Sequence, residues 1–242
     1  MGFPIIAGDR VHFVGDSITN FGWFNPTGGF VDQVNATWAS PAPTPIPASA
    51  SGGHIVVTGG VAIAGNTQPT RRAITVTSSG VVGNKAADIA GDVASRIVAF
   101  NPTKVILEVV INDVIQGTAP TAFAASYDSI ITQTLSSLPS VKFLCLSALC
   151  YGEQWQAGPA WGPNTGDSQI ITLDNAIQTI CTNRGMFYAD TRAAQVIYES
   201  INNTPAPGAV DGFVTADAVH PINPSGQVLM GTWVFPAVTV TP

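Results

Sequence analysis

The sequence predicts an α/β protein whose parallel β-sheet lies between two layers of helices, a three-layer αβα sandwich. The first observation is that short apolar runs alternate with longer stretches compatible with helices, the pattern of repeated βαβ units. The second is size, because 242 residues, 45% of them hydrophobic, suffice for one large domain with a substantial core. We therefore expect residues 1–242 to form a single domain.

Five apolar runs are the expected strands of this sheet. They lie near residues 11–15, 73–79, 104–110, 141–147 and 186–190. The expected helices are Ala86–Phe100, Thr121–Leu138, Gln169–Arg184 and Pro224–Val234. Pro102, Pro139 and Gly185 stand just beyond the first three helices, where residues that end helices are common.

Two neighbouring segments depart from this alternation. Residues 40–53 are rich in proline, alanine and serine, so we expect an extended connector rather than a helix. Residues 54–64 look like two short strands around a Gly-Gly pair, which predicts a β-hairpin insertion within the region near 40–72. The insertion would form a wall or lid of the substrate site, or equally an edge decoration or an oligomer contact.

Charge and composition restrict the partners of the protein. Charged residues make up 10% of the chain, and 9 basic against 15 acidic residues give a net charge of −6 with no basic run. We therefore expect neither nucleic acid nor an anionic membrane as a partner. No run of about 18 uninterrupted apolar residues predicts a membrane span, and residues 1–10 do not resemble a signal peptide. A cytoplasmic, virion-associated or secreted location after removal of a leader stays open, as does the oligomeric state.

Cysteines and histidines give no sign of a metal centre. Cys145, Cys150 and Cys181 form an odd set without CxxC spacing, which argues against a disulfide framework and against a zinc site. Cys145 lies inside an apolar run and is expected to be a small buried side chain. The three histidines are far apart and lack the spacing of a helical metal motif. We expect the protein to need neither a metal nor another cofactor.

The segment from Val11 to Thr19 is the most informative one in the chain. An apolar run ends abruptly in Gly15-Asp16-Ser17, which would present the Ser17 hydroxyl at the carboxyl end of a strand. Serines in such places are often turn residues or helix caps, so a catalytic role needs partners elsewhere. We expect Asp16 to brace this turn through hydrogen bonds to nearby backbone groups.

Later segments supply such partners. Asp217 and His220 stand in an Asp-x-x-His-Pro sequence, where a tight turn or helical start could bring the carboxylate to the imidazole. Another apolar run ends at Asn112, whose amide can donate a hydrogen bond to a developing oxyanion. Together these segments indicate acyl transfer through a serine nucleophile. Asp113 and Asp16 stay open as alternatives to Asp217 for orienting the histidine.

With these residues the chain resembles the SGNH hydrolases, the GDSL esterase/lipase family, which is named after a serine, a glycine, an asparagine and a histidine. The resemblance assigns these positions to Ser17, Gly80, Asn112 and His220, with Asp217 as the acid of the triad. It implies a flavodoxin-like arrangement of the sheet and hydrolysis of an ester through an acyl-enzyme. The oxyanion would be held by the N–H groups of Ser17 and Gly80 and by the Asn112 amide.

Two positions qualify this resemblance. Gly80 lies in a glycine-rich block followed by a helical pattern, while Gly60 and Gly65 are weaker rivals. Gly80 would serve through its N–H or only through its backbone conformation. Val110 stands where the family usually has a glycine, which bears on the shape of the pocket floor.

The substrate is expected to be a small-molecule or saccharide ester with a short acyl group, first of all O-acetyl, which would make the protein a carbohydrate O-deacetylase. Trp155 and Trp161 lie in a Gly/Pro-rich segment suited to stacking on a sugar ring or lining an acyl groove, or else to packing against the sheet edge. The family also contains lipases, thioesterases and arylesterases. A non-catalytic carbohydrate-binding module on this scaffold is the alternative from another class.

Overall fold

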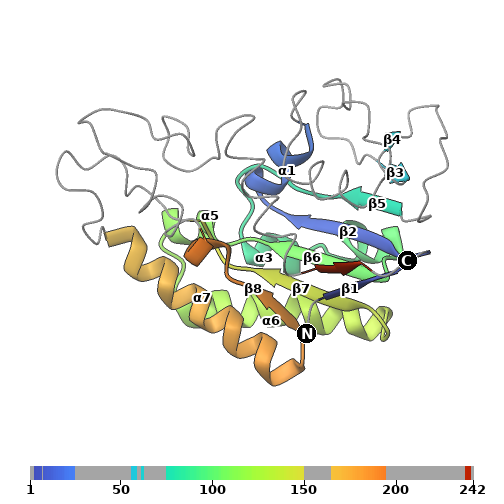
Figure 1. Ribbon diagram of the computed structural model, residues 1–242. Coiled ribbons are helices and arrows are strands. Elements are labelled where there is room, and N and C mark those ends of the chain that lie inside the picture. The colour runs from blue at the N-terminus through green and yellow to red at the C-terminus, as the bar shows by residue number, and fades with distance from the viewer. Residues whose placement is uncertain are drawn as a thin grey trace.

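The computed structural model describes residues 3–6, 8–24, 56–58, 61–62, 75–149, 165–194 and 238–240. Within these residues, a seven-stranded sheet forms the centre of the molecule (Figure 1). Five of its strands are parallel, in the spatial order β5-β2-β6-β7-β8. Their bounds are Arg10–Gly15 (β2), Thr75–Ser78 (β5), Lys104–Glu108 (β6), Lys142–Leu146 (β7) and Phe187–Ala189 (β8).

The strand order confirms the predicted fold class. The first strand of the parallel set lies between the second and the third, which is the flavodoxin-like order. Each expected strand is present, with its ends shifted by no more than two residues. Neighbouring residues of one strand, such as Ile106 and Leu107, are both at most 1% exposed. The sheet is therefore covered on both faces, which explains why its strands are apolar without alternation.

Helices α3 (Ala86–Ala90), α6 and α7 contact one another in that order along one face of the sheet (Figure 1). Helix α6 (Pro120–Ser137) starts with a proline in its first turn, where the missing N–H is not needed. Its buried residues recur at helical spacing: Phe123, Tyr127, Ile130, Ile131 and Thr134. Helix α7 (Thr165–Arg184) stops before Gly185, whose φ of 62° is typical of the position after a helix. Both helices were expected, although α7 begins four residues earlier than predicted.

The expected continuous helix over residues 86–100 is wrong. The segment forms α3 (Ala86–Ala90), α4 (Val93–Arg96) and a 3₁₀ turn, η1 (Val98–Phe100). The backbone leaves helical geometry at Asp92 (φ −139°, ψ 32°) and again at Ile97 (φ −128°, ψ −58°). Gly91 still has helical dihedral angles (φ −72°, ψ −16°), so the first break lies at Asp92. The broken path lets the Arg96 guanidinium reach the ends of β2 and β5.

One strand pairing was not expected from the sequence. Strands β1 (Phe3–Ile5) and β9 (Val238–Val240) pair in parallel although they stand at opposite ends of the chain (Figure 1). Phe3 is fully buried and packs edge-on against Phe187, with 5.3 Å between the ring centroids. The pair therefore anchors both segments beside β8.

Only small parts of the predicted insertion lie among the described residues. Strands β3 (Val56–Thr58) and β4 (Val61–Ala62) are antiparallel to each other, and β3 is antiparallel to β5, which extends the sheet at this edge. The remainder of the region near 40–72 and the expected helix Pro224–Val234 lie outside the described residues, so the insertion as a whole stays a prediction. No helix in the described ranges is both long enough and apolar enough to span a membrane.

Candidate active site

Three adjacent strands carry the residues that the sequence singles out. Ser17 follows β2, Gly80 follows β5 and Asn112 follows β6, and β2 lies between the other two strands. Parallel strands place their carboxyl ends at one edge, so the structure brings these residues to the same edge of the sheet. The chain order reverses at β2, and open α/β sheets bind ligands at such a switch point.

Ser17 is the first residue of α1 (Ser17–Phe24), a short helix that begins directly after β2. The Asp16 carboxylate accepts a hydrogen bond from the Ile18 N–H at 2.9 Å, and the Asp16 backbone carbonyl oxygen accepts one from the Asn20 N–H at 3.0 Å. Asp16 is thus the N-cap of α1. This confirms that Asp16 braces the turn, and it places Ser17, 3% exposed, at the positive end of a helix.

Position 80 requires a glycine because its backbone lies close to the backbone of α1. A Cβ atom at this position would lie 2.4 Å from the backbone nitrogen of Asn20, so any larger residue would push α1 away. The Asn20 amide donates to the Gly80 carbonyl oxygen at 2.8 Å, and the Val81 N–H donates to the Gly15 carbonyl oxygen at 3.1 Å. The glycine block and the turn at Ser17 are therefore joined by hydrogen bonds.

Asn112 lies in the first turn of α5 (Ile111–Ile115), which follows β6. Its side-chain amide donates to the carbonyl oxygen of Asn84 at 3.0 Å, which fixes the amide beside the glycine block and leaves its second N–H hydrogen for another acceptor. The Val110 side chain is fully buried, so the residue that replaces the usual glycine adds packing below this turn.

The Asp113 carboxylate makes a structural hydrogen bond. Its carboxylate accepts a hydrogen bond at 2.9 Å from the N–H of Ala86, the first residue of α3. The side chain is 1% exposed, and burial raises its pKa. Asp113 therefore joins the start of α3 to the turn that carries Asn112.

Arg96 is a site residue that sequence reasoning missed. Its side chain is 6% exposed, and Nη2 donates to the carbonyl oxygens of Gly15, at 3.0 Å, and of Ser79. Its Nη1 donates to the side-chain oxygen of Asn84. One guanidinium thus joins the loops that carry Ser17, Gly80 and the partner of Asn112. The signal in the sequence was that Arg96 is the one basic residue of the segment 86–100.

Glu108 was missed as well, although a carboxylate inside an apolar run is unusual. It is the last residue of β6 and is 1% exposed. Burial raises its pKa well above the usual value, and the nearby charge of Asp16 raises it further. Burial also raises the pKa of Asp16 to about 7, against the opposing effect of the Ile18 N–H. Two carboxyl groups of high proton affinity therefore lie beneath Ser17.

His12 is a structural histidine in the middle of β2. Its Nδ1 lies 2.6 Å from the Thr77 hydroxyl, and its Nε2 lies 2.6 Å from the Arg96 carbonyl oxygen and 3.0 Å from the Ser79 hydroxyl. The ring stacks on Phe100 at 4.3 Å between centroids. These contacts hold β5 and the segment that carries Arg96 against β2.

The remaining predicted site residues lie outside the described residues: Trp155, Trp161, Asp217 and His220. Their assignments stay predictions. Across residues 75–149 and the other described ranges, no group of three or more His, Cys, Asp or Glu side chains is arranged to hold a metal ion.

Comparison with known proteins adds the relationship to a family. Residues 13–227 match the GDSL-like lipase/acylhydrolase family. Curated proteins give no match.

Several solved structures share the fold. One is a catalytic serine-to-alanine variant of an acetylxylan esterase from Geobacillus stearothermophilus, 19% identical over 96% of this chain and 93% of that chain, with a TM-score of 0.66. A catalytic aspartate-to-alanine variant of that enzyme is 18% identical over 96% and 95%, with a TM-score of 0.68. An alpha/beta hydrolase from the metagenome of Lake Arreo, Spain, is 17% identical over 96% of each chain, also at 0.68.

Proposed function

Since the chain belongs to the GDSL-like lipase/acylhydrolase family and is an ester-hydrolysing enzyme, we propose that it cleaves short-chain carboxylic esters through Ser17 and an acyl-enzyme intermediate. One observation carries this proposal. Ser17 is the first residue of α1 at the switch point of the sheet, and the hydrogen-bonded loops of Gly80 and Asn112 lie on either side of it. That arrangement supports Ser17 as a nucleophile that lies beside donors for an oxyanion.

In the proposed reaction, the Ser17 hydroxyl attacks the ester carbonyl while His220 removes its proton. The C–O bond to the alcohol then breaks, and the histidine returns the proton to the leaving alkoxide. Water, activated by the same histidine, attacks the acyl-enzyme, releases the carboxylic acid and restores the serine. Asp217 orients the imidazole and stabilises its protonated form.

The spacing of the last two residues supports this part of the mechanism. The acetylxylan esterase has catalytic variants of a serine, an aspartate and a histidine, and the aspartate precedes the histidine by three positions. Asp217 precedes His220 by the same interval.

The negative charge on the carbonyl oxygen would be stabilised by the N–H groups of Ser17 and Gly80 and by the Asn112 amide. The Asn84 carbonyl oxygen already holds that amide in place, so little reorganisation accompanies the reaction. The N-terminus of α1 adds a favourable field, because backbone N–H groups there point toward the same region.

We propose an O-acetyl group on a saccharide as the substrate, which makes the protein a carbohydrate O-deacetylase. Support comes from the acetylxylan esterase, which shares the fold over nearly the whole chain. Trp155 and Trp161 are the candidates for stacking on the sugar, because indole rings bind sugar faces well.

The test measures hydrolysis of p-nitrophenyl esters from acetate to long chains, and acetate release from acetylated xylooligosaccharides, by the parent protein and by Ser17→Ala. We expect turnover of short esters and release of acetate by the parent only. Good activity on medium-chain esters without acetate release from any acetylated glycan would favour a lipase, thioesterase or arylesterase. Failure of a fluorophosphonate probe to label Ser17, with no turnover of any ester, would favour a binding module.

A further inference from the structure

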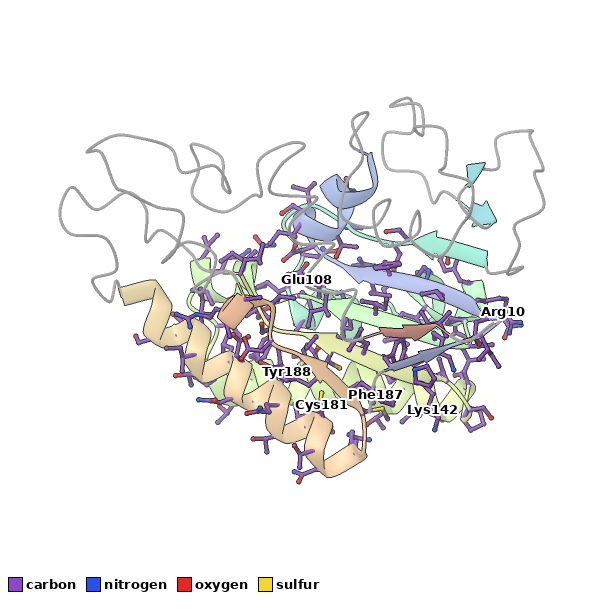
Figure 2. The ribbon with its side chains drawn as sticks, viewed as in Figure 1. Arg10, Glu108, Lys142, Cys181, Phe187 and Tyr188 are labelled. Atoms are coloured by element: carbon purple, nitrogen blue, oxygen red, sulfur yellow. The ribbon has the colours of Figure 1, made fainter. Side chains whose placement is uncertain are left out.

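Two buried carboxyl groups lie directly beneath the nucleophile turn. Gly15 of β2 is paired with Glu108 of β6, and this is the last pair of the two strands. Asp16 is the next residue of the chain, so it follows this pair at the carboxyl end of the sheet. Asp16 is fully buried and Glu108 is 1% exposed. Figure 2 shows Glu108 at the end of the sheet near α1, whereas Arg10, the first residue of β2, lies at the opposite end. A pair of carboxyl groups in such a place needs a chemical explanation.

Each carboxyl group accepts one hydrogen bond from a described residue. Oδ1 of Asp16 accepts from the Ile18 N–H at 2.9 Å, and Oε2 of Glu108 accepts from the Thr19 hydroxyl at 3.2 Å. Thr19 reaches Glu108 only because residue 15 is glycine, since a Cβ there would lie 2.2 Å from the Thr19 hydroxyl oxygen. The second oxygens, Oδ2 of Asp16 and Oε1 of Glu108, are buried and find no donor among the described residues.

Buried polar atoms are nearly always hydrogen-bonded, and two ionised carboxylates can only repel each other. A single proton between the two groups satisfies both open oxygens, because a carboxylic acid donates where a carboxylate accepts. The surroundings decide which group holds the proton. Asp16 accepts a hydrogen bond from a backbone N–H and lies near the positive charge of Arg96, and both favour its ionised form, whereas the negative charge of Asp113 opposes it. Glu108 receives only a neutral hydroxyl and faces the negative charges of Asp16 and Asp174.

We propose that Glu108 carries a proton on Oε1 and donates it to Oδ2 of Asp16, and that Glu108 is thereby a positioning residue for Ser17. The donated hydrogen bond fixes the Asp16 carboxylate in a position from which Oδ1 accepts from the Ile18 N–H and so caps α1. That cap fixes the first turn of α1 and with it the Ser17 hydroxyl. The shared proton is inferred from the arrangement of the two carboxyl groups alone, whereas its effect on catalysis rests on the proposed function of Ser17.

The pH dependence follows from the charged groups around the pair. The charges of Arg96 and Asp113 shift the pKa of Asp16, and those of Asp16 and Asp174 shift the pKa of Glu108. At alkaline pH the shared proton leaves, the two negative charges repel each other, and the capped turn loses its support. The parent enzyme should therefore lose activity on the alkaline side through this group.

The kinetic test compares Glu108→Gln with Glu108→Met. The glutamine amide donates to Asp16 at every pH and its oxygen accepts from Thr19, so we expect kcat at neutral pH within about threefold of the parent and no loss on the alkaline side from this group. Methionine has similar length but no donor, so we expect kcat to fall by about tenfold or more with little change in KM. Equal impairment of the two variants, or an unchanged alkaline profile in Glu108→Gln, would overturn the proposal.

An infrared measurement tests the shared proton without using activity. The resting parent protein at neutral pH should show the carbonyl stretch of a protonated carboxylic acid, and Glu108→Gln should lose it. Asp128→Asn is the matched control, because it removes an exposed carboxylate that pairs with Arg184 and should leave the band unchanged. If Glu108→Gln retains the whole band, the proposal is wrong even in an active enzyme. If the band behaves as expected but no ester is hydrolysed, the proposed function fails while the shared proton stands.

Discussion

Nη2 of Arg96 donates a hydrogen bond to the carbonyl oxygen of Gly15 at 3.0 Å, although 81 positions separate the two residues. The same nitrogen donates to the carbonyl oxygen of Ser79. The guanidinium therefore joins the end of β2 to the end of β5, immediately below the residues proposed as nucleophile and oxyanion donor. Burial lowers the pKa of this arginine, so the contacts are formed at the expense of its hydration.

Arg96→Met should therefore lower both stability and kcat. Methionine removes the arginine donor of the Ser79 carbonyl oxygen and one of two donors to the Gly15 carbonyl oxygen, which keeps the Val81 N–H. An unsatisfied buried group costs about 1–3 kcal/mol. Urea unfolding and ester hydrolysis measure the two effects. Arg184→Met is the control, because its ion pair with Asp128 lies at the surface and should contribute at most about 1 kcal/mol. Equal losses in the two variants would contradict the role of Arg96.

Ser17→Ala should abolish esterase activity while leaving the fold intact. Removal of a serine nucleophile commonly lowers kcat by more than about 10³-fold, because only transition-state binding remains. Hydrolysis of p-nitrophenyl acetate measures the loss, and circular dichroism checks the fold. Ser95→Ala removes an exposed hydroxyl on α4 and should leave kcat unchanged. Substantial activity in Ser17→Ala would show that another residue is the nucleophile.

Asn112→Ala should lower kcat by about 10²–10³-fold with a small change in KM, as expected when one oxyanion donor is lost. It also removes the hydrogen bond to the Asn84 carbonyl oxygen, so some stability is lost too. Gln133→Ala controls for that second effect, since this exposed amide donates to the Ala90 carbonyl oxygen at 2.8 Å far from Ser17. Steady-state kinetics of both variants separate the roles, and a change in KM alone would argue against an oxyanion donor.

Gly80→Ala should displace the first turn of α1, because the added Cβ would lie 2.4 Å from the Asn20 nitrogen. Overpacking of this kind typically costs about 1–3 kcal/mol, and here it also moves Ser17. Gly91→Ala is the matched control, since its Cβ would meet nothing closer than 3.5 Å and its φ of −72° suits alanine. We expect Gly91→Ala to have the same Tm as the parent or a higher one, and the same kcat.

The stability of Glu108→Gln relative to the parent should depend on pH. Burial raises the pKa of Glu108 above its usual 4.5, so the folded state holds this proton more tightly than the unfolded state. The free energy of unfolding of the parent then falls as pH rises from 4.5 to the folded pKa, by at most about 1.4 kcal/mol per pH unit. Glutamine does not ionise, so the variant should gain relative stability across this window. Urea unfolding at several pH values measures the gain, and a constant difference would contradict it.

The sequence by itself determined the order of the elements and the places where catalytic residue types follow strands. Apolar runs and helical spacing are local properties, so the five parallel strands and helices α6 and α7 could be predicted from neighbouring residues alone. The same reasoning singled out Ser17 and Asn112 as candidates, because a polar residue at the end of an apolar run is visible without knowledge of contacts.

Only the tertiary structure decided which distant groups support that site. The break that turns Arg96 toward Gly15, the approach of Gly80 to Asn20 and the pairing of β1 with β9 depend on register and packing between segments far apart in the chain. Glu108 shows the reason most clearly. Its sequence neighbours predict a strand, but its proton affinity is set by burial beneath α1 and by Asp16, which reaches it only through the alignment of β2 with β6.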